Sequence, residues 1–309
     1  MSDYTPKLIW FNGSIVPWEE ATVQVWSELA IRGSSIFEGI QAYWQAEEGR
    51  YYLLDLDAHL RRFFHSAKLL RFPCHLSGEE IRKAIFSLLP ALDYREHAHV
   101  RPTLYIDAGR YGYRPEDTKM GIHIAAFPLP RSPKLFTGIR CCVSSWRRIG
   151  DLGLSPRIKA GGSYLAMRLP RIEASERGLD EVILLNEHDT VSEASGATIF
   201  IIRDGCALTP PFSANILESV TRKRVLRLLS TELNVEAIER EITRTELYTA
   251  DEVFLCGTLC EILPVVEIDG YTIGTGEPGL ITVRCRDRYI QICESGATAP
   301  AGWLTLVPD

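Results

Sequence analysis

The sequence lacks the long apolar run that a membrane-spanning helix requires, because no stretch of its 309 residues approaches eighteen uninterrupted apolar residues. It also lacks an excess of positive charge: 34 lysines and arginines stand against 40 acidic residues, and the formal net charge is -6 at pH 7. A protein that binds nucleic acid needs clustered positive charge to neutralise phosphates. We therefore expect neither nucleic acid nor a membrane as a partner.

Cysteine pairs at metal-binding spacing are missing as well. The eight cysteines are scattered, without CxxC pairs and without histidines at the spacing of a zinc site. We expect reduced thiols, no disulfide framework and no bound metal. The first residues also lack the basic segment and apolar run of a secretory signal, so the expected location is cytoplasmic.

The length and the 46% hydrophobic content are enough for two domains. Residues 127–133 hold three prolines in seven positions, and proline fits neither a helix interior nor a central strand. We therefore predict an α/β (α+β) protein with a small N-terminal α+β domain at residues 1–127. A linker at 128–138 and a larger C-terminal domain at 139–309 follow.

Local patterns predict most of the elements. An Asn-Gly turn indicates a hairpin at residues 8–16. Asp57 can cap one helix, and Ser77 with Glu80 forms a capping box before a second. The other predicted elements are strands at 100–106, 121–127, 141–145, 181–185, 198–202 and 253–256, and helices at 164–177 and 220–233.

Lysine is scarce, with seven lysines beside 27 arginines, and Lys159 lies in an apolar, glycine-flanked segment at residues 155–162. A lysine that forms a Schiff base must be neutral part of the time, and apolar surroundings favour the neutral form. Glu193 follows a predicted strand and sits among small residues that leave room for a flat ring. Such a carboxylate can keep a pyridine nitrogen protonated. The pair suggests pyridoxal 5'-phosphate (PLP), although a surface lysine and a solvated loop acid are the alternatives.

The start of the predicted helix at 220–233 is a candidate phosphate site, because a first helical turn offers unpaired N–H groups and the positive end of the helix dipole. Arg62 could add a charge-assisted contact to the phosphate. The alternatives are that Ser219 caps the helix and that Arg62 is solvated.

Taken together, these segments resemble the fold type IV, class IV PLP-dependent aminotransferases, and most closely the branched-chain amino acid aminotransferases. The matching segments are Ile36-Phe37-Glu38-Gly39, Ile158-Lys159-Ala160-Gly161-Gly162, Val191-Ser192-Glu193, Leu208-Thr209-Pro210-Pro211, Thr221-Arg222 and residues 250–265. The resemblance spans essentially residues 8–283. It implies a two-domain fold similar to that of D-amino acid aminotransferase, with PLP between the domains of a homodimer or higher homo-oligomer.

The resemblance also implies roles for matching positions. Lys159 would hold the cofactor covalently and act as general base, Tyr164 would approach the ring hydroxyl, and Glu193 would meet the pyridine nitrogen. The implied contacts to the cofactor's phosphate come from Arg62, Ser219, Val220, Thr221 and Thr258. The implied substrate contacts come from Arg32, Phe37, His99, Arg101, Gly257 and Leu259.

The implied reaction moves an amino group from a branched-chain-like L-amino acid to a 2-oxo acid, 2-oxoglutarate, by ping-pong chemistry. Three alternatives stay open. The same fold serves transaminases of D-amino acids, β-amino acids or (R)-amines, and it serves lyases of the aminodeoxychorismate type. A non-catalytic protein that keeps the fold is the third.

Several positions depart from the branched-chain pattern. Arg32 and His99 stand where tyrosines are usual, Leu259 replaces a usual alanine, and Leu129 replaces a frequent aromatic residue. A cationic pocket for a carboxylate is one interpretation of Arg32, His99, Arg101 and Arg110. Ion pairs with Glu28 or Asp107 are the other.

Three further expectations concern loops and local strain. Tyr111 and Tyr113 could close over the site. Pro170 should kink the helix after Lys159. Ser219 replaces a family glycine, so a positive φ there would cost strain.

Overall fold

The computed structural model describes residues 5–109 and 118–308, and its contacts divide the chain into two compact units. The first unit comprises Met1–Pro130, Ile158–Gly162 and Ile292–Asp309, and the second comprises Arg131–Arg157 and Ser163–Gln291. The division after Pro130 falls within the predicted linker. The segments 158–162 and 292–309, which we had assigned to the second domain, pack with the first unit instead.

The first unit is built on a sheet whose described strands all pair antiparallel. The strand order is β17-β5-β4-β6-β7-β1-β2, and β3 also pairs with β6. These strands are β1 (Leu8–Phe11), β2 (Ser14–Pro17), β3 (Ser35–Phe37), β4 (Ile40–Gln45), β5 (Arg50–Leu54), β6 (Ala98–Gly109), β7 (Thr118–Pro128) and β17 (Leu304–Leu306). The predicted hairpin is confirmed as β1 and β2.

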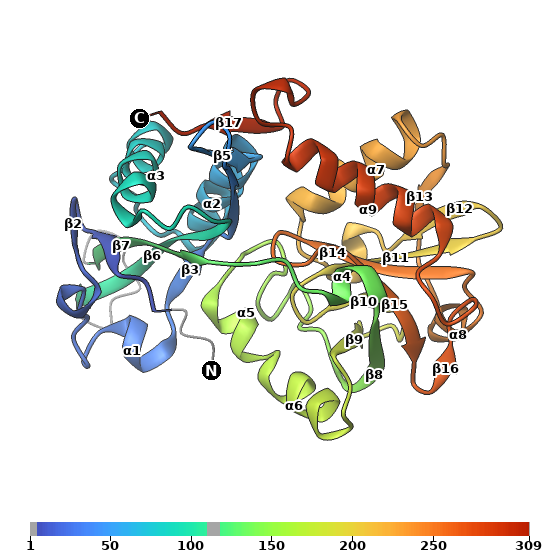
Figure 1. The fold of residues 1–309 in the computed structure, drawn as a ribbon. Coiled ribbons are helices and arrows are strands. Elements are labelled where there is room, and N and C mark those ends of the chain that lie inside the picture. Colours follow the sequence, from blue (N-terminus) through green and yellow to red (C-terminus); the bar gives the residue numbers. More distant parts are fainter. Residues whose placement is uncertain (1–4, 110–117, 309) are drawn as a thin grey trace. The chain divides into compact units, whose positions relative to one another are not determined.

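The helices of this unit are α1 (Glu28–Arg32), α2 (Leu56–Leu70) and α3 (Gly78–Leu92). The two long helices lie side by side in Figure 1, and α3 contacts β1 and β7. The capping box of Ser77 and Glu80 is confirmed. The prediction that Asp57 caps α2 is wrong: Asp55 precedes the helix because buried Leu56 already belongs to it, and Asp57 lies in the first turn, where it pairs with Arg82.

The proline-rich segment is more ordered than we expected. Phe127 and Pro128 complete β7, opposite His99 and Ala98 of β6. Proline is tolerated there because the last residue of a strand can do without its ladder hydrogen bond. The part of the segment that leaves the sheet therefore begins only at Leu129.

The second unit contains a mixed sheet in the order β10-β9-β8-β15-β14-β11-β12-β13, with β16 paired to β15. The strands are β8 (Ile139–Arg147), β9 (Glu181–Leu185), β10 (Val191–Ala194), β11 (Thr198–Arg203), β12 (Cys206–Thr209), β13 (Ala237–Glu239), β14 (Glu252–Gly257), β15 (Glu261–Ile268) and β16 (Tyr271–Thr272). Parallel pairs join β8 to β9 and to β15, and β12 to β13. The four strands predicted for this unit are confirmed, and their apolar residues form its core.

The remaining helices are α4 (Lys134–Thr137), α5 (Gly161–Leu165), α6 (Arg168–Glu176), α7 (Val220–Thr231), α8 (Arg244–Tyr248) and α9 (Leu280–Cys293). Arg288 of α9 pairs with Glu232, which follows α7, and α7 contacts β14 and β13 (Figure 1). The predicted kinked helix at 164–177 is two separate helices. Pro170 lies in the first turn of α6, where its missing N–H breaks no helical hydrogen bond, so it starts a helix and does not kink one.

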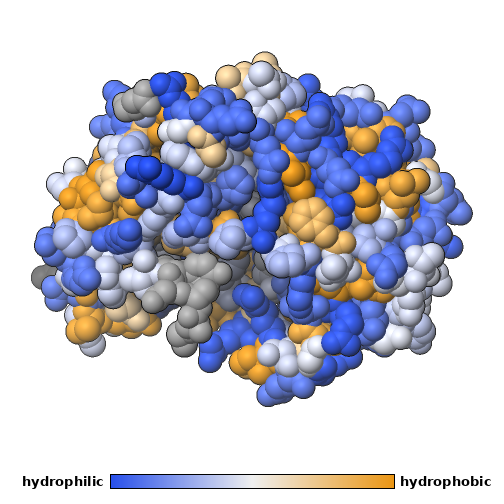
Figure 2. Space-filling model, in the orientation of Figure 1, coloured by the Kyte–Doolittle hydropathy of each residue, from blue (hydrophilic) through white to orange (hydrophobic). Residues whose placement is uncertain are grey.

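The surface mixes polar and apolar residues. Figure 2 shows hydrophobic patches separated by hydrophilic residues on the face that it draws. Leu165 and Leu169, near α5 and α6, are 71% and 50% exposed. Among the described helices, none is both long and apolar enough to cross a membrane. All eight cysteines are free thiols.

Candidate active site

The main chain around Lys159 is fixed by three contacts within the first unit. Its N–H donates to Ser66 Oγ on α2 at 3.1 Å, and its carbonyl accepts the N–H of Phe37 at 3.0 Å. Ala160 forms an isolated bridge with Ile36. Lys159 is half-buried, and its Nζ lies 5.0 Å from the centre of the Phe37 ring. The amine is therefore held beside β3 and α2 by residues far from it in the sequence.

Gly161 allows this close packing. A Cβ at position 161 would lie 2.6 Å from Ser35 Oγ and 3.3 Å from the carbonyl oxygen of Gly33. Only a residue without a side chain fits at the first distance unless its neighbour moves. Gly161, two positions after Lys159, thus lets its segment approach Gly33 and Ser35 closely.

Arg62, a predicted phosphate ligand, is held by a buried carboxylate. Its Nε and Nη2 donate to the two oxygens of Glu38 at 2.6 and 2.8 Å, and His59 Nδ1 lies 2.8 Å from Glu38 Oε2. Burial alone would raise the pKa of Glu38, but Arg62 and His59 outweigh it and hold that pKa well below its ordinary value. Glu38 was part of a matched motif, yet we had not recognised that it orients Arg62.

The predicted substrate residues of the first unit fall into two groups. Phe37, His99 and Arg101 lie together, and the Arg101 guanidinium sits 3.9 Å from the centre of the Phe37 ring. Arg32 lies apart on α1 and pairs with Glu28 at 3.9 Å, which agrees with the ion-pair interpretation. Asp107 pairs with Lys119 at 3.3 Å.

His99 adds no positive charge to this group at neutral pH. Burial and the positive charges of Arg101 and Lys159 lower its pKa to about 3. The interpretation of His99 as part of a cationic pocket is therefore wrong, because its imidazole is neutral. Arg110, Tyr111 and Tyr113 lie outside the described residues.

In the second unit, Glu193 is a buried carboxylate with a hydrogen bond on each oxygen. Oε1 accepts from Arg148 Nε at 2.8 Å, and Oε2 accepts the N–H of Leu217 at 3.1 Å. The Glu193 side chain is 9% exposed and that of Arg148 is 6% exposed. Both carboxylate oxygens of Glu193 are therefore held by N–H donors, and the side chain is fixed in one orientation.

The start of α7 is capped by Ser219, whose Oγ accepts the N–H of Arg222 at 3.1 Å. Ser219 has a φ of -69°, so the positive φ that would cause strain is not adopted there. Val220 and Thr221 form the first turn, and Thr221 is buried. Arg222 is fully buried and donates to the carbonyl oxygen of Pro210 at 2.8 Å, which ties the Thr-Pro-Pro segment to this helix.

The other predicted residues of this unit lie on α5 and after β14. Tyr164 is half-buried on α5. Gly257 ends β14, and a Cβ there would meet Gly196 and Ala197 at ordinary contact distances. Thr258 and Leu259 form the turn to β15, and Leu259 is 61% exposed. The exposed leucine occupies the position where the family pattern has alanine.

The family described as "Amino-transferase class IV" matches residues 35–268, which is more than half of the chain. The chain belongs to this family. The "Probable branched-chain-amino-acid aminotransferase" of Aquifex aeolicus is 40% identical over 309 residues, covering 100% of this chain and 99% of the relative. The "Branched-chain-amino-acid aminotransferase" of Escherichia coli (strain K12) is 35% identical over 303 residues, covering 97% of each chain.

Solved structures agree with this assignment. A branched-chain amino acid aminotransferase from Thermobaculum terrenum, solved in its PLP form, superposes with a TM-score of 0.92 at 36% identity. The match covers 99% of this chain and 100% of that one. The predicted family, the mixed helix and sheet architecture and the aminotransferase class are therefore confirmed.

Arg148 is the residue of this class IV aminotransferase that sequence reasoning missed. Arg148 directly follows β8, and its main-chain N–H donates to the carbonyl oxygen of Leu185 at 2.9 Å. Its Nη1 is buried and has no hydrogen-bond partner among the described residues. The sequence contains 27 arginines, and nothing local distinguishes this one.

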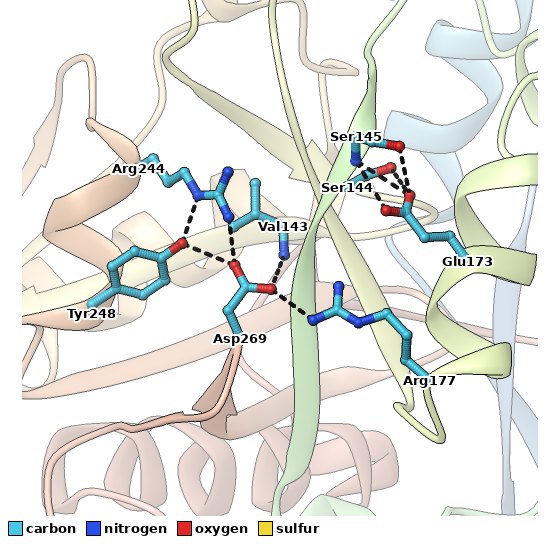
Figure 3. Close-up of polar contacts among 8 residues, drawn as sticks. All are labelled: Val143, Ser144, Ser145, Glu173, Arg177, Arg244, Tyr248 and Asp269. Carbon is cyan, nitrogen blue, oxygen red and sulfur yellow. Dashed lines mark hydrogen bonds and ion pairs between the residues drawn. The ribbon is translucent and has the colours of Figure 1, made fainter.

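Strand β8, which presents Arg148, is anchored by two acidic residues (Figure 3). Asp269 accepts hydrogen bonds from the N–H of Val143 at 3.3 Å, from Arg177 at 3.2 Å, from Arg244 at 2.9 Å and from Tyr248 at 2.8 Å. Glu173 of α6 accepts from the hydroxyl of Ser144 at 2.7 Å and from the N–H of Ser145 at 3.2 Å. The strand is thereby tied to α6, to α8 and to the turn after β15.

Proposed function

We propose that this family member is a PLP-dependent transaminase of branched-chain-like L-amino acids, with 2-oxoglutarate as amino acceptor. The single observation that carries the proposal is the placement of Lys159. Its main chain is hydrogen-bonded on both sides, while its amine lies over the ring of Phe37, which Arg101 also contacts. The printed names of the relatives from A. aeolicus and E. coli support the choice of substrate.

Each unit contains residues whose charges and hydrogen-bonding groups suit parts of PLP. The buried, doubly hydrogen-bonded carboxylate of Glu193 suits a protonated ring nitrogen. In the second unit, the first turn of α7, with Val220 and Thr221, suits a phosphate. In the first unit, Glu38 fixes the position of Arg62, a cation of the kind that pairs with phosphate. We assign Tyr164, Ser219 and Thr258 to the cofactor's surroundings, and Gly257 and Leu259 to the substrate's.

When bound, PLP supplies an electron-accepting ring that makes the substrate's α-proton acidic. The residues of the chain do the rest. The amine of Lys159 would bind the aldehyde carbon of the cofactor, and the amine of the substrate would displace it there. The freed amine of Lys159 would then accept the proton from the substrate's α-carbon. Arg101 would attract a substrate carboxylate, because a guanidinium pairs well with that group. Glu193 would keep the ring nitrogen protonated throughout.

We also propose that the enzyme works as a homodimer or higher homo-oligomer in the cytoplasm. The resemblance to the class IV aminotransferases supports the oligomer, and the eight free thiols fit a reducing compartment. Analytical ultracentrifugation of the cofactor-loaded protein checks the first point. A single species at the mass of the monomer, 34.8 kDa, would overturn it.

The assignment of Lys159 is tested by reducing the PLP-saturated protein with borohydride and mapping its peptides by mass spectrometry. The cofactor mass is expected on the peptide that contains Lys159 and to be absent in the Lys159→Ala variant. Lys119→Ala is the matched control, because this exposed lysine belongs to the same unit, and its labelling should equal that of the wild type. Label on another lysine, or none, would refute the proposal.

The substrate assignment needs a separate experiment. The PLP form is mixed with single L-amino acids, D-amino acids, β-amino acids or amines, and the loss of the bound cofactor's visible absorbance is followed. We expect rapid loss with L-leucine, L-isoleucine and L-valine. Rapid loss with D-amino acids or amines alone would reject the branched-chain assignment. Release of pyruvate without an amino acceptor would indicate a lyase.

A further inference from the structure

One face of the first sheet combines Lys159 with an unusual set of polar side chains. His99, Arg101 and Thr103 alternate along β6, so they point to the same face. Gln41 of β4 lies opposite His99, and both Phe37 of β3 and His123 of β7 lie opposite Thr103. Directly opposed residues share a face, so these side chains surround Arg101. This set, with Lys159 above Phe37, is the polar face.

Three buried atoms of the polar face have no hydrogen-bond partner within the part of the chain that the structure describes. They are Gln41 Oε1, His99 Nδ1 and His123 Nδ1. Gln41 is 5% exposed and His99 is 4% exposed. Buried polar atoms in folded proteins nearly always have a partner, because losing the hydrogen bonds made to water costs free energy. Three such atoms on one face therefore indicate that something else bonds to them.

The His99 ring is also fixed in place by its surroundings. A Cβ at position 39 would lie 2.7 Å from His99 Cε1, so the imidazole occupies space that only a glycine leaves open. On the other strand it contacts Phe127, with ring centres 5.3 Å apart. The ring therefore has little freedom to turn its Nδ1 towards solvent.

The two histidines of the polar face add no positive charge to that of Arg101 and Lys159 at neutral pH. Burial, with the charge of Arg101, lowers the pKa of His123 to about 4, and His99 is neutral as described above. A neutral imidazole offers one donor and one acceptor, and the amide oxygen of Gln41 is an acceptor. Arg101 can balance one carboxylate of a bound substrate. The neutral groups then remain for an uncharged part of the substrate.

We propose that Gln41, His99 and His123 bind an uncharged polar side chain of the amino donor, a carboxamide or a hydroxyl group. The inference rests on the proposed function, since it assumes that donors react at Lys159. It extends the donor range beyond hydrocarbon side chains. A carboxamide can donate to Gln41 Oε1 and exchange a hydrogen bond with an imidazole, whereas a hydrocarbon leaves all three atoms without a partner.

L-Asparagine and L-leucine test this directly, because their side chains have nearly the same shape and differ in the two terminal groups. The experiment follows the first half-reaction of the PLP-loaded protein and compares the apparent second-order rate constants for the two amino acids. The informative quantity is the asparagine-to-leucine ratio. A change that merely loosens the fold would lower both constants and leave the ratio unchanged.

The variants form matched pairs. His99→Leu and His123→Leu remove the polar atoms, singly and together, whereas His99→Asn and His123→Asn keep a polar atom near the position of Nδ1. We expect the ratio to fall at least tenfold in the double leucine variant, equivalent to about 1.4 kcal/mol. It should stay near the wild-type value in the asparagine variants. His65→Leu, which replaces an exposed histidine of α2, is the control.

The outcomes separate the two proposals. If L-leucine reacts and the ratio is the same in the wild type and in the leucine variants, the inference is overturned and the proposed function stands. If no amino acid reacts with the PLP-loaded wild type, both are overturned. Should the double variant fail to fold, the single variants decide, because each is expected to lower the ratio and an unchanged ratio in both would contradict the inference.

Discussion

Acid should destabilise this protein through the two histidines of the polar face, the buried His99 and the half-buried His123. The pKa values of His99 and His123 are about 3 and about 4 in the folded chain, against 6.5 for an unperturbed histidine. The unfolded state therefore binds more protons than the folded state below pH 6.5. Their contribution to the free energy of unfolding is intact above pH 6.5 and is lost as the pH falls towards the folded values.

The size of the effect follows from the same linkage. At pH 5 an unfolded imidazole is almost fully protonated, whereas both folded imidazoles remain neutral. The free energy of unfolding should then be lower than at pH 7 by about 2 kcal/mol for each histidine, or about 4 kcal/mol for both. Asparagine does not titrate in this range, so the double variant His99→Asn, His123→Asn should lack this part of the acid sensitivity.

Urea unfolding at pH 7 and pH 5 measures the difference. The loss of stability between the two pH values should be smaller in the double variant than in the wild type, and each single variant should lie between them. His65→Asn, at an exposed position, is the control and should behave like the wild type. An equal loss in the wild type and the double variant would refute the reasoning, because the histidines would then be charged or solvated in the folded protein.

Three further changes test other contacts. Arg148→Met removes one partner of a buried ion pair, so we expect Glu193 to lose its orientation and the free energy of unfolding to fall by about 3–5 kcal/mol. The PLP dissociation constant should rise. A titration of the apoprotein with PLP that finds an unchanged constant would contradict this. Gly161→Ala should cost about 1–3 kcal/mol by overpacking, and Ser35→Ala should relieve part of that cost in a double-mutant cycle. Asp269→Asn weakens the anchor of β8 and should lower the thermal midpoint, by an amount equivalent to about 1–3 kcal/mol; calorimetry that finds no shift would show that the contacts in Figure 3 contribute nothing net.

The sequence predicted best those features that are encoded by neighbouring residues. The first hairpin has an Asn-Gly turn between two apolar runs, and the second long helix begins with the capping box of Ser77 and Glu80. Both appear in the structure because the residues that they bring together are three to nine positions apart in the sequence. The start of α2 was predicted wrongly because it depends on a tertiary property. The burial of Leu56 decides where that helix begins.

The candidate site shows which contacts the sequence could not predict. The motif around Lys159 indicated a cofactor lysine, but not its support, because Ser66 lies 93 positions away in the sequence. Arg148 and Glu193 are 45 positions apart, and no spacing rule connects them. Such pairs form only when strands from distant parts of the chain become neighbours. Sequence motifs therefore provided the candidate reacting groups, and tertiary structure was needed to find what holds them.

The segment around Lys159 explains why the domain assignment of this residue could not be read from the sequence. Its neighbours on both sides, up to Arg157 and from Ser163, belong to the second unit, yet the five residues between them pack with the first. The bonds that decide this are the N–H to Ser66, the carbonyl to Phe37 and the close approach of Gly161 to Ser35. A segment of five residues that packs with a different unit from its neighbours in the sequence needs small residues and main-chain hydrogen bonds at that point. Gly161 and the Phe37 contact therefore serve to hold the lysine beside β3.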